Sequence, residues 1–161
     1  MSILTVADAL AQCRLESDYP VDQLQPYIDG AEAAACAYLN RSIYPDEESL
    51  MAAQDAAPSL VGNANAAYQM AMAAAQQIED PLARATAVSV AETRLADAQR
   101  AAKWAVFGIV ANASVISAMR LTLGHLFTNR ESVIAGSAAA AVALPQGAEY
   151  LLGPHRRVMM P

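Results

Sequence analysis

The stretch DPLARATAVSVAETRLADAQRAAKWAVFGI, residues 80–109, decides the fold class of this 161-residue chain. Asp80 followed by Pro81 is typical of a helix start, because aspartate can cap the first turn and proline is tolerated at the first helical position. Apolar residues then recur at alternating spacings of three and four, the period of one helix face. They are mostly alanines: Val88, Ala91, Leu95, Ala98, Ala102, Ala105 and Ile109. We therefore predict a long helix with a seam of small side chains.

A second alanine-rich stretch precedes this helix and has the same period. Its apolar side carries Tyr68, Ala71, Met72, Ala75 and Ile78. A seam of small side chains lets two helices approach closely but buries little apolar area per turn. We expect residues 64–110 to form a helical hairpin that packs on itself. Before it, a helix is expected to begin near Pro45 and to stop before Pro58, with Gly62 and Asn63 in a loop.

Two helices are predicted nearer the N-terminus. Thr5 and Asp8 form a capping pattern, which predicts a short helix from about Val6 to Cys13. The next helix is expected to begin near Asp22. Its apolar stripe consists of Leu24, Tyr27, Ile28, Ala31, Ala34, Ala35, Tyr38 and Leu39.

The C-terminal third contains one more long helix and a short one. Asn112 or Ser114 can cap the long helix. Its expected buried face is Ile116, Met119, Leu123, Leu126 and Phe127. Residues 136–143 have small side chains and are expected to form an extended arm, while residues 146–152 are expected to form the short helix, which Gly153-Pro154 ends.

The composition supports an all-α fold. Alanine and unbranched side chains are abundant, and they lose little rotamer freedom in a helix. We predict a small bundle of about four to six helices, with an alanine-rich helical hairpin as an insert and an extended C-terminal arm. The expected organisation is a helical domain over 1–135 with the insert at about 47–110, followed by the arm with its short helix over 136–161.

Charge is unevenly distributed along the chain. Residues 1–80 carry twelve acidic side chains against Arg14 and Arg41, a net charge of −10, whereas residues 81–161 carry four acidic against eight basic side chains, a net charge of +4. Opposite charges at the two ends allow copies to dock head to tail, and such contacts close into rings when the rotation permits. The alternative is a solvated acidic face with scattered arginines.

The sequence contains no pattern typical of a catalytic, cofactor or metal site. Nucleophile, phosphate-loop and zinc motifs are missing, and only two histidines are present. Cys13 and Cys36 have no metal-ligand spacing, so free thiols in a reducing compartment are expected. We therefore predict a non-enzymatic protein with no catalytic residues, no cofactor and no metal.

The sequence also argues against membrane and nucleic-acid binding. The apolar segment Trp104 to Met119 is shorter than the about 20 residues needed to span a bilayer. The arginines are few, and no aromatic residue is interleaved with them, as stacking on nucleic-acid bases would require.

Short motifs occur in a fixed order near the two ends of the chain, within residues 1–46 and 114–158. They are Leu4-Thr5, Arg14-Leu15, Tyr38 with Arg41, Asn129-Arg130-Glu131, Leu144-Pro145, and Tyr150-Leu151-Leu152 followed by Arg156-Arg157. In this order the chain resembles the head-tail connector (adaptor) proteins of long-tailed bacteriophages. The middle of the chain is not covered by the resemblance.

The resemblance implies an all-helical subunit that forms a twelve-fold ring on the portal vertex of the capsid after DNA packaging. The ring would offer a docking surface to the tail or to a head-completion protein, and DNA would pass through it without specific binding. The implied location is the head-tail interface of the virion, after assembly in the host cytoplasm.

The resemblance also assigns roles to the motif residues. The motifs up to Glu131 would be structural, with Arg130 at a helix end and Glu131 able to pair with Arg41 or another basic group. The later residues would form a partner or subunit interface: Leu144, Pro145, Tyr150, Leu151, Leu152, Arg156 and Arg157. We expect partners to order this arm, the alternative being that its short helix folds back on its own subunit.

Two other functions stay open at this point. One is a small dimeric regulatory protein that does not bind DNA. The other is a membrane-active phage protein that uses residues 104–119.

Overall fold

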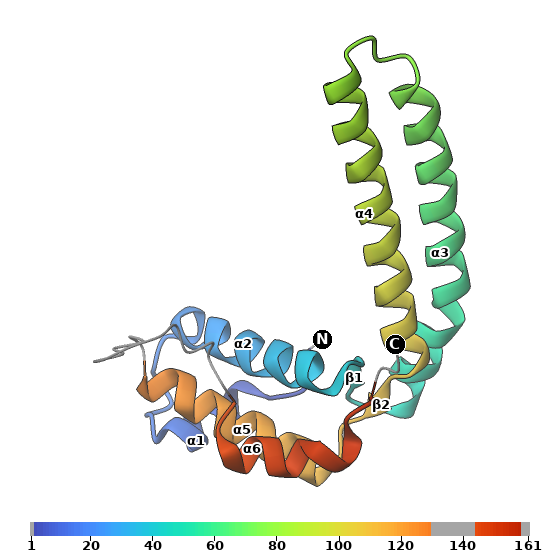
Figure 1. Ribbon diagram of the computed structural model, residues 1–161. Helices are drawn as coiled ribbons and strands as arrows, with labels where there is room; N and C mark the ends of the chain where they lie inside the picture. The colour runs from blue at the N-terminus through green and yellow to red at the C-terminus, as the bar shows by residue number, and fades with distance from the viewer. Residues whose placement is uncertain (1, 130–143, 159–161) are drawn as a thin grey trace. The chain divides into compact units, whose positions relative to one another are not determined.

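The computed structural model describes residues 2–129 and 144–158, and over these residues the fold is all-α (Figure 1). The elements are α1 (Val6–Cys13), α2 (Val21–Leu39), β1 (Ile43–Tyr44), α3 (Glu47–Ala75), α4 (Pro81–Val106), β2 (Ile109–Val110), α5 (Ala113–Thr128), α6 (Gln146–Leu152) and the 3-10 turn η1 (Gly153–His155). The predicted small helical bundle with an alanine-rich hairpin is confirmed. The expected arm at 136–143 lies outside the described residues.

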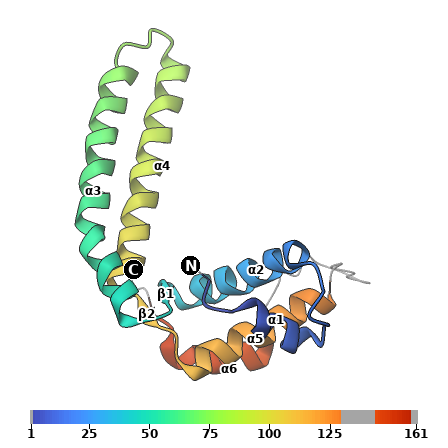
Figure 2. The ribbon, with the colours of Figure 1, turned by 180° about the vertical axis from the view of Figure 1, so that it is seen from behind.

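The chain forms two compact units. The first contains the residues up to Pro45 and those from Val110 onward, and the second is Asp46–Ile109. The first unit holds α1, α2, α5 and α6, and both views show α2 and α6 beside α5 (Figure 2). Its core is built from large side chains: Leu4, Leu24, Ile28, Leu39, Val115, Met119, Leu123 and Leu152.

Local capping sets the ends of α1 and α2, as the sequence predicts for α1. The Asp8 backbone N–H donates to Thr5 Oγ1 over 3.1 Å, and the Thr5 N–H donates back to Asp8 Oδ2 over 3.3 Å. Arg14 at the end of α1 and Asn40 at the end of α2 adopt left-handed backbone conformations, with φ of 54° and 55°. This conformation reverses the chain and lets nearby N–H groups reach the last carbonyls of each helix.

Helix α5 begins as predicted but buries a different face. Asn112 Oδ1 accepts a hydrogen bond from the Val115 N–H over 3.0 Å. Met119 and Leu123 are fully buried as expected, whereas Ile116, Leu126 and Phe127 are only partly buried, so this part of the prediction is wrong. The buried positions are Val115, Ala118, Met119, Thr122 and Leu123.

Thr122 explains the rotation of the buried face. Its hydroxyl donates to the Ala118 carbonyl over 2.9 Å, and this bond satisfies the polar atom inside the core. A prediction that counts only apolar residues as buried therefore misses Thr122 and assigns apolar residues at the edge of the buried face of α5 to that face.

The second unit is the α3–α4 hairpin, in which the two helices run side by side (Figure 1). Asp46 Oδ1 accepts from the Ser49 N–H over 2.7 Å at the start of α3. Asp80 accepts from the Leu82 and Ala83 N–H groups at the start of α4. The buried hydrophobic residues of the hairpin are all alanines: Ala57, Ala75, Ala91 and Ala102.

The sequence predicts that helix α3 stops before Pro58, and that prediction is wrong. It continues through Pro58, Gly62 and Asn63 to Ala75, so the hairpin spans Glu47 to Val106 instead of 64–110. Proline removes one helix hydrogen bond and clashes with the preceding turn. Packing along α4 overrides that local preference, because Ala57 beside the proline is buried against α4.

The apolar segment 104–119 is divided among three elements: the end of α4, strand β2 and the start of α5. Strand β2 pairs with β1, and the Ala111 N–H donates to the Tyr44 carbonyl over 2.8 Å. Within the described part of the chain, no helix has the length and apolar character needed to cross a bilayer.

Candidate functional site

Most of the family-motif residues lie at helix ends in the first unit. Leu4 is buried, Thr5 caps α1, and the Leu15 N–H donates to the Leu10 carbonyl over 2.9 Å just after Arg14 reverses the chain. Asn129 ends α5, where its backbone and side-chain nitrogens both donate to the His125 carbonyl. Arg130 and Glu131 lie outside the described residues.

The basic C-terminal segment is fastened to the end of α2. The Arg157 N–H donates to the Leu39 carbonyl over 3.0 Å, and Asn40 Nδ2 donates to the Arg157 carbonyl over 3.2 Å. The Arg156 guanidinium carbon lies 5.0 Å from the centre of the Tyr38 ring, within the range of a cation–π contact. The motif residues Tyr38, Arg156 and Arg157 therefore meet at one place, although they are far apart in sequence.

Arg41 lies three residues after Tyr38 and is half-buried. Its buried Nε atom has no hydrogen-bond partner among the described residues. Glu131, one expected partner of Arg41, lies outside those residues.

The N-terminal segment is anchored by a carboxylate that sequence reasoning missed. Glu32 Oε1 accepts from Ser2 Oγ over 2.7 Å, from the Ile3 N–H over 2.7 Å and from the Leu4 N–H over 2.8 Å. Such multiple acceptance holds residues 2–4 against α2 and places Leu4 in the core. The only signal in the sequence is an acidic residue beside the apolar stripe, which is common on solvated helices.

A second missed contact joins α1 to α5. Arg120 Nη2 lies 2.5 Å from Asp8 Oδ1. The hydrogen bond from the Thr5 hydroxyl lowers the pKa of Asp8, and the positive charge of Arg120 lowers it further, whereas partial burial acts in the opposite direction. Asp8 therefore both caps α1 and ties it to α5.

A serine and a histidine meet where η1 contacts the start of α5. Ser114 Oγ lies 3.0 Å from His155 Nε2, and Asn112 Nδ2 lies 3.3 Å from the same atom. A nucleophile and a base at this distance still need a third group that orients the base. No carboxylate contacts His155 in the described parts of the chain, so we interpret the pair as a structural fastening of η1.

Helix α6 folds back on its own subunit, the alternative to an arm held only by partners. Ala148 and Leu152 are fully buried, and α6 packs against α5 and α2. A Cβ added at Gly147 would lie 3.4 Å from Leu121 Cδ1, which shows how closely α6 approaches α5. Of the residues expected at an interface, Leu152 belongs to the core. Tyr150 is 85% exposed.

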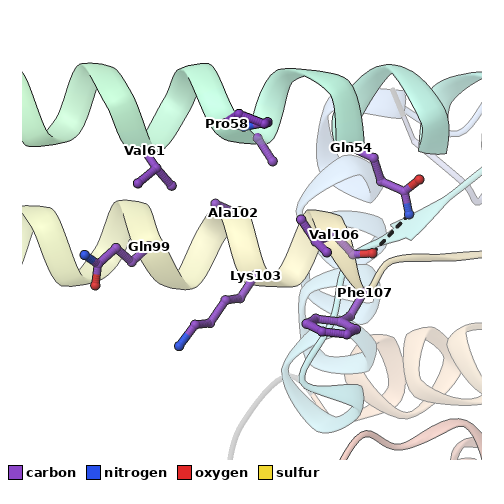
Figure 3. Close-up of a pocket in the computed structure, with 9 residues that line it drawn as sticks. Gln54, Pro58, Val61, Gln99, Ala102, Lys103, Val106 and Phe107 are labelled. Carbon is purple, nitrogen blue, oxygen red and sulfur yellow. Dashed lines mark hydrogen bonds between the residues drawn. The ribbon is translucent and has the colours of Figure 1, made fainter.

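The hairpin contains an open apolar pocket of about 390 Å³ between α3 and α4 (Figure 3). Pro58 and Val61 line it from α3, and Ala102 and Val106 from α4. Gln54 Nε2 donates to the Val106 carbonyl over 3.0 Å at its edge. Phe107 also lines the pocket, whose few polar groups come from Gln54, Gln99 and Lys103, so the pocket is suited to an apolar side chain.

Metal-ligating side chains and thiols are the remaining groups to consider among the described residues. They include no group of three metal-ligating side chains. Cys13 and Cys36 are free and half-buried, and burial raises the pKa of both thiols. Thiols with raised pKa values carry little thiolate at neutral pH and are poor nucleophiles.

Comparison of the chain with protein-family models, with curated proteins and with solved structures finds no match.

Proposed function

We propose that the chain is a head-tail connector (adaptor) subunit of a long-tailed bacteriophage. It would form a ring on the portal vertex after DNA packaging and provide the surface on which the tail or a head-completion protein docks. The observation that carries the proposal is the agreement between the motifs and the compact units. The motifs cover 1–46 and 114–158, and the first unit comprises the residues up to Pro45 and from Val110.

This agreement has a physical meaning. Motifs from both ends of the chain meet in one packed unit, where they cap helices and fasten segments to one another. The uncovered middle folds as a separate hairpin, as expected of an insertion between two ends that belong together. Motifs that matched by chance would not be expected to end at the boundary between the two units.

Two further features fit a connector. Tyr150 and Arg156 are exposed on the C-terminal segment of the first unit, and tyrosine and arginine are the residue types that most often anchor protein interfaces. Each copy carries a net charge of −6. A ring of such copies would be strongly acidic overall, which opposes tight binding of the phosphate backbone.

The test is binding of the purified chain to the portal oligomer encoded by the same genome, measured by co-sedimentation and by electron microscopy. We expect a ring of density on one end of the portal. Tyr150→Ala should weaken binding about tenfold or more, since an exposed aromatic anchor is lost. Val21→Ala, an exposed apolar change on α2, serves as the control and should bind like the unchanged chain.

A chain that stays in the supernatant with the portal at every ratio tested would contradict the proposal. A genome that encodes no portal protein would contradict it as well.

A further inference from the structure

We propose that the α3–α4 hairpin is a self-association surface. In this contact, the outer face of α3 in one copy packs against the outer face of α4 in a second copy, with the two hairpins pointing in the same direction. The inference does not depend on the phage assignment, because every observation behind it comes from the hairpin itself.

The outer faces are defined by helix periodicity. Ala57 and Ala75 are 18 residues apart, about five turns, and both are buried on the side of α3 that faces α4. Residues about half a turn away from them point to the opposite side. The outer face of α3 thus carries Glu48, Met51, Asp55, Gly62 and Met70. The outer face of α4, opposite Ala91 and Ala102, carries Leu82 and the ion-paired Asp97 and Arg100, with Lys103 at its edge.

Large apolar side chains are exposed on these outer faces. Met51 is 62% exposed, Met70 69% and Leu82 76%. The fully buried side chains between the two helices are alanines, whereas these three larger apolar side chains are exposed to water. A surface of this kind is typical of an interaction site.

Charge complementarity identifies the occupant as another copy of the same hairpin. Helix α3 has three acidic residues and no basic one, whereas α4 has four basic residues and two acidic ones. The hydrogen bond from Gln54 to the Val106 carbonyl places Asp55 close to the level of Lys103 along the hairpin. Figure 3 shows Lys103 pointing away from α3. By helix periodicity, Asp55 lies on the side of α3 away from α4.

The levels of these charges also fix the direction of the contact. When two hairpins lie side by side and point the same way, Asp55 of one copy meets Lys103 of the next at the same height. In the described residues neither group has an ion-pair partner within the chain. Opposite orientations would instead bring the acidic start of α3 next to the hairpin turn, which contains Glu79 and Asp80.

Gly62 provides an independent reason for a close neighbour. Glycine inside a helix costs about 0.5–1 kcal/mol relative to alanine. No atom of the described chain lies within 4 Å of the position that a Gly62 Cβ would occupy. Nothing in the described part of the subunit therefore needs a glycine there, whereas a second helix packed closely on this face would, as in other small-residue contacts.

The experiment uses the full-length chain in sedimentation velocity over a range of protein concentrations. Two charge-reversed variants are compared with the unchanged chain: Glu48→Lys/Asp55→Lys on α3, and Arg100→Glu/Lys103→Glu on α4. All four side chains are exposed, and far-UV circular dichroism checks that both variants remain helical. We expect the unchanged chain to assemble as concentration rises, and each variant alone to associate at least about tenfold more weakly.

Mixing the two charge-reversed variants provides the decisive measurement. An equimolar mixture of the two variants restores opposite charges at both contacts and should assemble like the unchanged chain. Glu16→Lys/Asp18→Lys, an equal charge change in the first unit, is the matched control and should not alter assembly. The proposal is overturned if the unchanged chain stays monomeric at all concentrations, if the single variants assemble normally, or if the mixture of folded variants does not recover.

A steric variant tests the same face without charge. Gly62→Leu replaces a poor helix former with a good one, so the hairpin stays folded while close approach is blocked. We expect association to weaken at least about tenfold. Ala56→Leu, which adds a leucine to an exposed flank of α3, is the control and should associate normally. Normal assembly of Gly62→Leu would show that this face is not in the contact.

Discussion

The first unit buries leucine, isoleucine and methionine side chains, whereas the hairpin buries alanines although its helices are longer. Helix α3 has 29 residues and α4 has 26, against 16 in α5. Burial stabilises in proportion to the apolar area removed from water, so each turn of α5 gains more than each turn of α3. Helix length is therefore a poor guide to stability in this chain.

The difference also suggests how the two units depend on their surroundings. The first unit has a core that can support its helices within one copy. The hairpin relies on helix propensity, on its aspartate caps and on a thin seam, and most helical stability in proteins comes from packing of an apolar face. If hairpins of neighbouring copies pack together, the missing burial is supplied between copies.

The largest expected effect contrasts a core residue with an exposed residue of the hairpin. Leu123 is fully buried in α5, and Leu123→Ala should lower the free energy of unfolding by about 2–5 kcal/mol. Met70→Ala should change it by less than about 0.5 kcal/mol in the monomer. Urea unfolding at low protein concentration measures both. Equal losses would mean that the two regions are stabilised in the same way.

A smaller loss is expected at Phe127. Its ring contacts Tyr27 edge to face at a centroid distance of 5.4 Å and Tyr19 at 6.2 Å. Because Phe127 is only partly buried, Phe127→Ala should cost about 1.5–3 kcal/mol instead of the 3–5 kcal/mol typical of a fully buried ring. The same unfolding measurement applies. A loss below about 0.5 kcal/mol would show that the aromatic cluster contributes nothing.

A gain in stability is expected in the hairpin at Gly62. With open space around the position, Gly62→Ala should stabilise monomeric α3 by about 0.5–1 kcal/mol. Gly30→Ala in the first unit is the matched change, and there the new methyl would meet Leu126 Cδ1 at 3.4 Å, which should reduce the gain. Thermal unfolding of both variants at low concentration compares them. A larger gain at Gly30 would reverse the contrast.

The smallest effect depends on pH. The pKa of Asp8 is lowered in the folded state, so its contribution is fully present above the ordinary value of 3.8 and is lost as the pH falls through the folded value. Asp8→Asn should cost about 0.2–1 kcal/mol at pH 7, since the pair with Arg120 is partly exposed. The difference from the unchanged chain should vanish toward pH 2. A constant difference across this range would exclude an ionic contribution.

Local signals in the sequence predicted a good part of this fold. The Thr5–Asp8 box, Asn112 and Asp80 act within one helical turn, and all three cap helices where expected. The errors arise where distant segments decide. Pro58 lies within a continuous helix because α4 packs beside it, and Thr122 is buried because its hydroxyl bonds within its own helix.

The contacts of the candidate site were the hardest to predict. Glu32 binds a segment 28 to 30 residues away, and Asp8 and Arg120 are 112 residues apart. Neither spacing has a signature in a single sequence. The fold-back of α6 likewise depends on the close approach of Gly147 to Leu121, which only the packed structure reveals.

Hydrogen exchange of the full-length chain, followed by mass spectrometry at several protein concentrations, tests the central claim most directly. The claim is that the first unit is stable by itself and that the hairpin is stabilised by other copies. We predict strong protection of α2 and α5 at every concentration, and protection of α3 and α4 that rises with concentration. Protection of α3 and α4 that equals that of α2 and α5 in the most dilute sample would contradict the claim.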